Sequence, residues 1–168
     1  MSGEINWFTP IFTPHNIFRV QTAAGKSWGD FIGAGLFYFE GFGNQLLEAG
    51  TNRRYRQIEN FSGLGDNSQI ADRFAKFTVE NIFPSVKIGQ RFGDSYLRRA
   101  DISVFHQRLY SEFEDTSAQY YNLGIQSNWY LTNFYTIDAT LSLGFARAWD
   151  QAGNDYDEFF LYIKLFRN

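Results

Sequence analysis

The last third of the chain alternates apolar and polar side chains with a period of two over long stretches. Within residues 134–149, one face is mainly apolar and the other mainly small or polar. Such alternation is typical of a strand whose side chains point to the two sides of a sheet in turn. A membrane-spanning strand needs ~9–11 residues, whereas an average strand has ~5–6. The pattern therefore predicts strands of the membrane-spanning kind.

The neighbouring segments 119–131 and 156–166 repeat this plan, so three consecutive strands share one apolar face. The residues predicted to face lipid are Leu123, Ile125, Trp129, Tyr135, Ile137, Leu141, Leu143, Phe145, Phe159, Leu161, Ile163 and Leu165. On the opposite face, we expect a polar cluster in the barrel interior, formed by Asp138, Glu158, Tyr162 and Lys164. Since buried charges are usually paired, a structural ion pair is the simplest role for this cluster, and pore lining is the functional alternative.

Upstream, the pattern predicts further strands at about 97–111, 74–91, 53–61, 28–42 and 16–22. Pro84 requires a bulge, a break or an edge position, because proline donates no ladder hydrogen bond. Pro10 and Pro14 predict an irregular N-terminal arm over 1–15, which leaves 16–168 as the barrel domain.

The connections predict the direction of the strands. Turns at 93–95 and 132–133 are short, whereas 62–73, 112–118 and 150–155 are longer and polar. Outer-membrane barrels have short periplasmic turns and longer outer loops. The fold class predicted is therefore all-β, an antiparallel up-and-down barrel of about eight long strands, closed alone or as part of a larger barrel.

Composition narrows the class of protein. The 168 residues carry a formal net charge of -3 without a long basic run, so we expect no nucleic-acid partner. Cysteine is absent, and aromatic residues make up 20% of the chain, which favours strands. No window approaches the ~20 apolar residues of a membrane-spanning helix. The first residues lack a signal peptide, so an outer-membrane location requires that it was removed or that the chain is an excerpt.

The segments 120–125, 133–136, 141–148 and 158–165 resemble the closing strands of bacterial outer-membrane β-barrel proteins. In particular, they are similar to the barrels found behind periplasmic β-propeller modules. The resemblance covers about the last third of the chain and implies a barrel in the bacterial outer membrane. One feature departs from it: many such barrels end in an outward-facing aromatic residue, whereas Phe166 falls on the inner face here.

No catalytic, metal or cofactor site is predicted. With only two histidines, a multi-histidine zinc site cannot be built. Ser103, His106 and Glu112 suggest a hydrolase triad, but Ser103 and His106 point to opposite faces of one strand. The acidic turn near Asp150 is read as solvated rather than as a calcium site. The basic cluster at 53–56 is read as a contact with lipid head groups rather than with nucleic acid.

The function predicted is a non-enzymatic outer-membrane barrel, serving as a membrane anchor, a structural protein or an assembly component. Its partners would be the lipid bilayer and other subunits of an envelope assembly. One alternative is a soluble lipocalin-like barrel that binds a small apolar ligand, and another is an outer-membrane lipid hydrolase. The first two differ in where the apolar face lies: outward toward lipid, or inward around a cavity.

Overall fold

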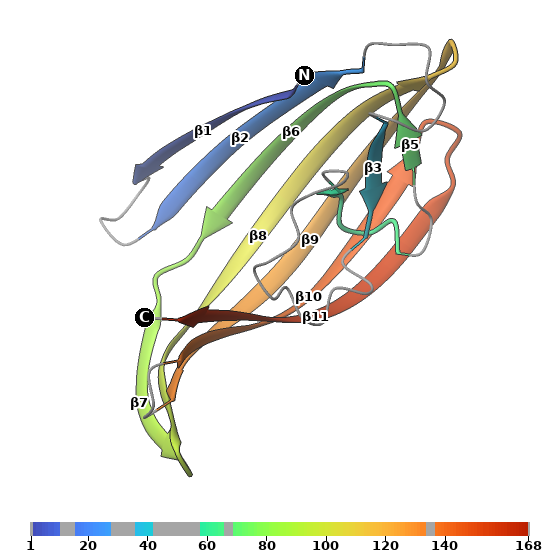
Figure 1. Ribbon diagram of the computed structural model, residues 1–168. Coiled ribbons are helices and arrows are strands. Elements are labelled where there is room, and N and C mark those ends of the chain that lie inside the picture. Colours follow the sequence, from blue (N-terminus) through green and yellow to red (C-terminus); the bar gives the residue numbers. More distant parts are fainter. Residues whose placement is uncertain are drawn as a thin grey trace.

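The computed structural model describes residues 2–10, 16–27, 36–41, 58–65, 69–133 and 137–167. These residues form strands and no helix, which confirms the all-β prediction. The strands are β1 (Ser2–Pro10), β2 (Ile17–Lys26), β3 (Phe37–Glu40), β4 (Ile58–Asn60), β5 (Gln69–Ala71), β6 (Arg73–Ile82), β7 (Val86–Phe92), β8 (Ser95–Phe113), β9 (Thr116–Asn133), β10 (Ile137–Asp150) and β11 (Asp155–Arg167) (Figure 1).

The main sheet follows the order β1-β2-β6-β8-β9-β10-β11, and every neighbouring pair is antiparallel. The short strand β7 pairs with β8 beside this path. With seven strands alternating in direction, the two edge strands β1 and β11 run the same way. Within the described residues these edges do not pair with each other, so the sheet is not closed into a barrel.

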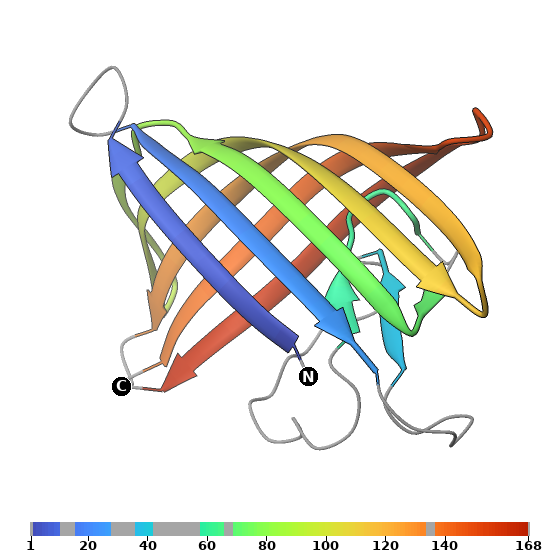
Figure 2. The same ribbon diagram turned by 90° about the horizontal axis from the view of Figure 1, so that it is seen from above.

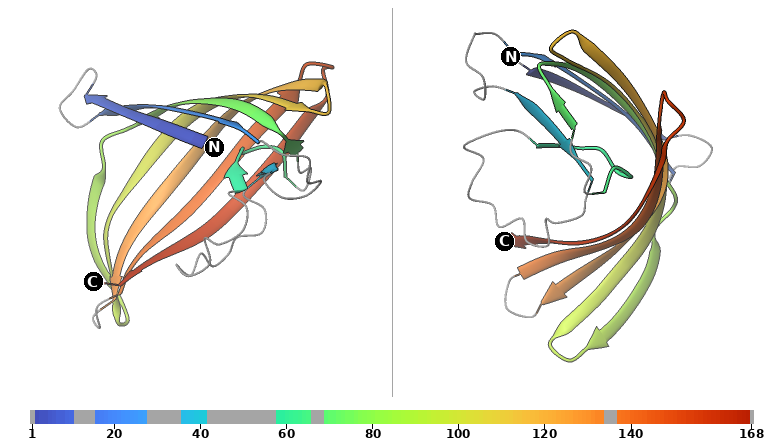
Figure 3. Two further views of the ribbon diagram at one scale, coloured as in Figure 1. Left: turned by 45° about the horizontal axis from the view of Figure 1, so that its top comes forward. Right: turned by 90° about the vertical axis from the view of Figure 1, so that its right-hand side faces the viewer.

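The main sheet curls into a trough with a convex and a concave face (Figures 2 and 3). Its central strands are long: β8 has 19 residues and β9 has 18, which exceeds the ~9–11 residues that cross a membrane. The side chains of each strand alternate between the two faces, and burial alternates with them along β8.

A second sheet of three short strands lies on the concave side of the trough (Figure 3). In this insert, β3 pairs with β4 in parallel and with β5 antiparallel. Phe37 and Phe39 pack edge-on against Phe74 of the main sheet, with ring centroids 4.6 and 5.0 Å apart. The shared core consists of Phe37, Phe39, Phe61, Leu64, Ala71, Phe74, Leu109, Tyr120 and Ala148. The insert therefore fills one part of the trough with apolar side chains.

Three upstream segments differ from the sequence prediction. The predicted arm over 1–15 instead contains β1. Pro10 is compatible with this strand because it stands at the end of an edge strand, where a missing backbone N–H donor is tolerated. The segments 28–42 and 53–61, predicted as strands of the barrel, contribute β3 and β4 to the insert and no strand to the main sheet. Most of their other residues lie outside the described ranges. The predicted strand 74–91 is interrupted at residues 83–85, where Pro84 separates β6 from β7.

The connection expected as a longer loop over 112–118 is a two-residue turn. β8 continues to Phe113 and β9 begins at Thr116, which leaves Glu114 and Asp115 between them. Both have positive φ angles, 47° and 65°, as the central residues of a tight hairpin turn require.

Candidate functional site: the two faces of the sheet

The predicted lipid-facing residues lie together on the convex face wherever the structure describes them. Ile125 is 49% exposed and Phe159 is 72% exposed, and Phe145 and Phe159 are cross-strand partners. Leu123, Leu161 and Leu165 are also exposed, while Trp129, Leu141, Leu143 and Ile163 are half-buried on the same face. Tyr135 and the side chain of Ile137 lie outside the described residues. A broad apolar surface results.

This apolar surface continues onto strands that the sequence prediction did not include in it. Ile5 and Trp7 of β1 are 72% and 58% exposed, and their cross-strand partners on β2 are Thr22 and Val20. Phe77 of β6 and Ile102 of β8 extend the same face. Alternation in 2–10 is the sequence signal for the β1 residues, whereas Pro10 and Pro14 argue against a strand there.

Charged side chains on the convex face lie toward one end of the strands. Arg147 of β10 and Asp157 of β11 form a two-pronged ion pair in which Nε and Nη2 each lie 2.6 Å from a carboxylate oxygen. The Asp157 carboxylate holds the arginine in place beside the hairpin that joins these strands. This arrangement offers no reactive group, because both charges are neutralised by each other.

The residues of the considered hydrolase triad are not brought together. Ser103 is fully buried on the concave face, and its hydroxyl has no hydrogen-bond partner within the described ranges. His106 lies on the convex face, with Nδ1 2.5 Å from the carbonyl oxygen of Asn122, so this ring nitrogen donates there. Glu112 pairs with Arg73 at 3.0 Å. No nucleophile, base and acid therefore share a site in this group.

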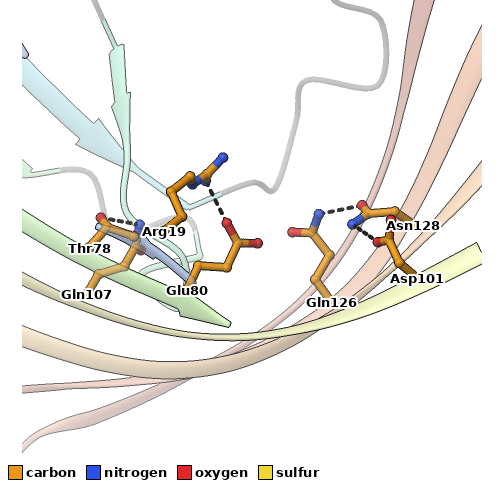
Figure 4. A network of polar contacts seen from close by, with 7 residues as sticks. All are labelled: Arg19, Thr78, Glu80, Asp101, Gln107, Gln126 and Asn128. Atoms are coloured by element: carbon orange, nitrogen blue, oxygen red, sulfur yellow. Dashed lines mark hydrogen bonds and ion pairs between the residues drawn. The ribbon is translucent and has the colours of Figure 1, made fainter. Parts of the chain in front are cut away.

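The concave face carries a polar network that joins three strands (Figure 4). Asn128 donates from Nδ2 to the buried carboxylate of Asp101 at 2.9 Å. The Asn128 amide oxygen accepts from Gln126 and from the hydroxyl of Ser142, both at 2.6 Å. Nearby, the Arg99 guanidinium lies 4.4 Å from the ring centroid of Tyr130. The concave face thus carries this polar network in addition to a small apolar cluster of Phe105, Ala146 and Phe160 outside the insert.

A second group of polar contacts on this face lies between β2, β6 and β8. Arg19 and Glu80 form an ion pair at 2.8 Å, and Gln107 donates to the Thr78 hydroxyl at 3.4 Å (Figure 4). Glu80 is 8% exposed, so its charge depends on this partner. Glu80 is therefore paired in the way that a structural ion pair requires.

The predicted interior cluster is divided rather than compact. Asp138 forms an ion pair with Arg98 at 3.2 Å and accepts from the Thr132 hydroxyl at 2.8 Å. Asp138 is opposite Phe166 in the β10–β11 ladder, whereas Glu158 is opposite Ala146. The two carboxylates are thus separated by the strand length from 138 to 146, ~27 Å. Tyr162 lies between them and is half-buried, and the Lys164 side chain lies outside the described residues.

Glu158, Gln107 and Asn122 attach the insert to the concave face. Glu158 is buried and its Oε2 accepts from the backbone N–H of Gly63 at 2.6 Å. Gln107 accepts from the Ser62 N–H at 3.1 Å, and Asn122 donates to the Ser62 carbonyl at 2.5 Å. Through these hydrogen bonds to the backbone of Ser62 and Gly63, the three side chains hold a loop of the insert against the main sheet.

The described residues hold neither a membrane-spanning helix nor a cluster of metal ligands. They contain no helix long and apolar enough to cross a membrane. Among these same residues, no three or more His, Cys, Asp or Glu side chains gather in a group that could hold a metal ion. In comparisons with known proteins, no family model, no curated protein and no solved structure matches this chain.

Proposed function

We propose that this chain forms a non-enzymatic wall of a β-barrel in the bacterial outer membrane and serves as an anchor, a structural protein or an assembly component. The observation that carries the proposal is the division of the sheet into an exposed apolar convex face and a concave face on which buried polar networks lie beside the core shared with the insert. Monomeric soluble proteins rarely expose large contiguous apolar patches, and such patches mark membrane or protein contacts.

Strand length supports the same proposal. Trp129 on β9 is opposite Leu141 on β10, and Trp149 lies eight positions further along β10. These two tryptophans of the convex face are therefore separated by ~27 Å along the strand direction. The apolar band of an outer-membrane barrel is ~25 Å tall, has aromatic residues at both borders and is crossed by strands that tilt by ~35–45°. At that tilt the two tryptophans would be ~19–22 Å apart across the membrane, which supports a role for them near the two borders.

The lipocalin-like alternative has less support. It requires apolar side chains around a ligand cavity on the concave face. In the described structure, the apolar part of that face is occupied by Phe39, Phe61 and Leu64 of the insert. The remainder carries the packed side chains of Phe105, Ala146 and Phe160 and the Asp101–Asn128 network.

The test is detergent dependence combined with the depth of these tryptophans in vesicles. Variants that retain Trp129 or Trp149 alone, with the other tryptophans replaced by Phe, would be read with quenchers placed at known depths in the lipid. We expect the protein to require detergent, and each tryptophan to be quenched best near the head groups. A monodisperse protein in detergent-free buffer, or tryptophans that lipid quenchers do not reach, would contradict the proposal.

A further inference from the structure

Lys87 of β7 and Arg99 of β8 are directly opposite each other in the ladder that joins these two strands. Both side chains are exposed. Residues in such positions share a face of the sheet, with Cβ atoms ~4.5–5.5 Å apart, and like charges there are destabilising. An anion in contact with both side chains would remove this repulsion.

No carboxylate forms an ion pair with either side chain in the part of the chain that the structure describes. Asp138 is engaged by Arg98 at 3.2 Å, so neither of those two charges is available. Asp101, two residues along β8 from Arg99, accepts a hydrogen bond from Asn128 at 2.9 Å. The two opposite cations therefore have no ion-pair partner of their own among these residues.

The ring of Tyr130 positions the guanidinium of Arg99. The two residues are cross-strand partners, and the Arg99 Cζ lies over the ring, 4.4 Å from its centroid. The Tyr130 hydroxyl donates a hydrogen bond to Asp101, which fixes the ring in turn. A guanidinium that lies over an aromatic ring keeps N–H donors along its edge, and this planar fork matches two oxygens of one oxyanion. Arg99 is therefore held in a position from which it can bind such a group.

The pair lies on the concave face, at the end of the trough away from the insert. Arg99 shares this face with Asp101, because the ladder with β9 is regular from Arg99 onward (Figure 4). Gln107, which binds the insert, is eight residues further along β8, or ~27 Å away. Tyr130 directly follows Trp129, which the proposed function places near a border of the apolar band. The pair thus faces water at the mouth of the trough rather than lipid.

We infer that Lys87 and Arg99 together bind one phosphate group. A phosphate monoester carries a charge of about −1.5 to −2 at pH 7, which two cations neutralise, whereas a carboxylate carries a single negative charge. The Arg99 guanidinium binds two phosphate oxygens in its own plane, and the Lys87 ammonium adds a point charge. The group belongs either to inorganic phosphate or to a phosphorylated small molecule. This inference does not depend on the membrane location, because it uses only the contacts among β7, β8 and β9.

The test compares sodium phosphate with sodium chloride at equal ionic strength, in denaturant unfolding of the full chain in a non-ionic detergent. We expect phosphate to raise the denaturant midpoint more than chloride does, because a ligand that binds only the folded state stabilises it. Chloride measures the effect of charge screening alone.

Calorimetric titration identifies the source of the phosphate group. The purified chain is titrated with inorganic phosphate and, separately, with glycerol phosphate. Tighter binding of glycerol phosphate would assign the site to a phosphorylated molecule, whereas equal or weaker binding would assign it to inorganic phosphate. Binding of neither compound would overturn the inference.

Three variants and one control identify the site. Arg99→Gln and Lys87→Gln should each weaken phosphate binding about tenfold, because each removes hydrogen bonds to a charged group. Arg99→Lys retains the charge without the planar fork and should weaken binding less than Arg99→Gln does. Arg147→Gln removes an exposed arginine of the convex face, one that Asp157 already neutralises, and should leave phosphate binding unchanged.

Lys87→Gln has a second readout that a merely structural lysine would not give. Without phosphate, this variant should be at least as stable as the wild-type chain, because a like charge opposite Arg99 has been removed. With saturating phosphate, the order should reverse, because only the wild-type chain retains both cations. A variant that is less stable by the same amount in both buffers would contradict the assigned role.

Two further results would overturn the phosphate site. Equal midpoints in phosphate and chloride would leave the two charges only a role in protecting the outer edge of β7 from pairing with other chains. An equal loss of phosphate binding in Arg147→Gln and Arg99→Gln would show only the general surface charge. Neither result bears on whether the chain enters vesicles, so failure of this inference and failure of the proposed function are distinguishable.

Discussion

The Glu158 carboxylate accepts a 2.6 Å hydrogen bond from the backbone N–H of Gly63, a residue 95 positions earlier in the chain. The same carboxylate lies so close to Gly41 that a Cβ at that position would overlap both of its oxygens. Gly63 in turn lies against Ala148 and has a φ of 101°, which side chains other than glycine rarely adopt. One side chain of the last strand thus fixes two glycine-containing segments of the insert.

Replacing Glu158 by Ala should loosen the insert, because the Gly63 N–H loses its buried acceptor. Leaving a buried hydrogen-bonding group unsatisfied costs ~1–3 kcal/mol. Hydrogen exchange at the Gly63 amide measures this directly, and we expect it to accelerate strongly in Glu158→Ala and less in Glu158→Gln, which retains an acceptor oxygen. Unchanged protection of Gly63 in Glu158→Ala would contradict the assigned role.

Gly124→Ala should destabilise the sheet through a steric conflict on the concave face. A Cβ at Gly124 would overlap the Phe105 ring on the neighbouring strand, where Phe105 and Gly124 are cross-strand partners. Overpacking of this kind costs ~1–3 kcal/mol. Denaturant unfolding should show the loss, and the double variant with Phe105→Leu should recover part of it. Additive losses in the double variant would argue against a direct conflict.

Ile125→Arg distinguishes a lipid-facing surface from a water-facing one. Ile125 lies near the middle of β9 and is 49% exposed, so in water this substitution should change stability by no more than ~0.5 kcal/mol. At the middle of a bilayer, an arginine on the lipid face costs ~2–4 kcal/mol. We expect the larger cost when unfolding is measured in lipid vesicles.

Ser117→Arg is the matched control for Ile125→Arg. Ser117 is exposed at the start of the same strand, on the same face, close to the hairpin turn. Near an interface the cost of arginine falls to ~0–1 kcal/mol. Equal and small effects at both positions would show that the convex face does not lie in lipid.

Acid should weaken the β10–β11 hairpin, because Asp150 organises its turn beyond the apolar surface. Its carboxylate accepts from the side chain and backbone of Asn154 and from the Ala152 N–H, at 2.8–2.9 Å. The hydrogen bonds from Asn154 are the main reason that the pKa of Asp150 lies below its ordinary value. The charged form is thus favoured in the folded hairpin.

The sign of the pH effect follows from this lowered pKa. The stabilisation is fully present above the ordinary pKa of an aspartate, about 3.9, and is lost as the pH falls through the lower folded value. Amide protection in the turn should therefore decrease over that interval in the wild-type chain. Asp150→Asn should show weaker protection at neutral pH and less change with acid. A wild-type hairpin insensitive to acid would refute this role of Asp150.

The last three strands were predictable because alternation alone defines a face. The predicted segments 119–131, 134–149 and 156–166 end within three residues of β9, β10 and β11. A shift of one residue would move the whole apolar set to the other side, so the pattern determines which side chains share a face. It does not determine which residues are level with one another, because that depends on register. Asp138 and Glu158 share the concave face but occupy distant rows for this reason.

The insert could not be recognised from local pattern. Residues 37–40 have the aromatic composition of a wall strand, but they pair with β4 and β5 rather than with the main sheet. Which partner a strand takes depends on long-range contacts, here those of Phe39 with Phe74 and of Gly63 with Glu158. Likewise, proline in 1–15 lowers the expectation of a strand, although proline is compatible with the end of an edge strand.

The common direction of β1 and β11 restricts how the trough can be completed. If β1 met β11 directly, the seam would be a parallel ladder in an otherwise antiparallel wall. A seam that is antiparallel throughout needs an odd number of additional strands between these edges, which brings the total to an even number. A closed barrel with an odd total of strands would contain one parallel pair, whereas one with an even total would be antiparallel throughout. The two forms differ in the hydrogen-bond pattern at that one seam.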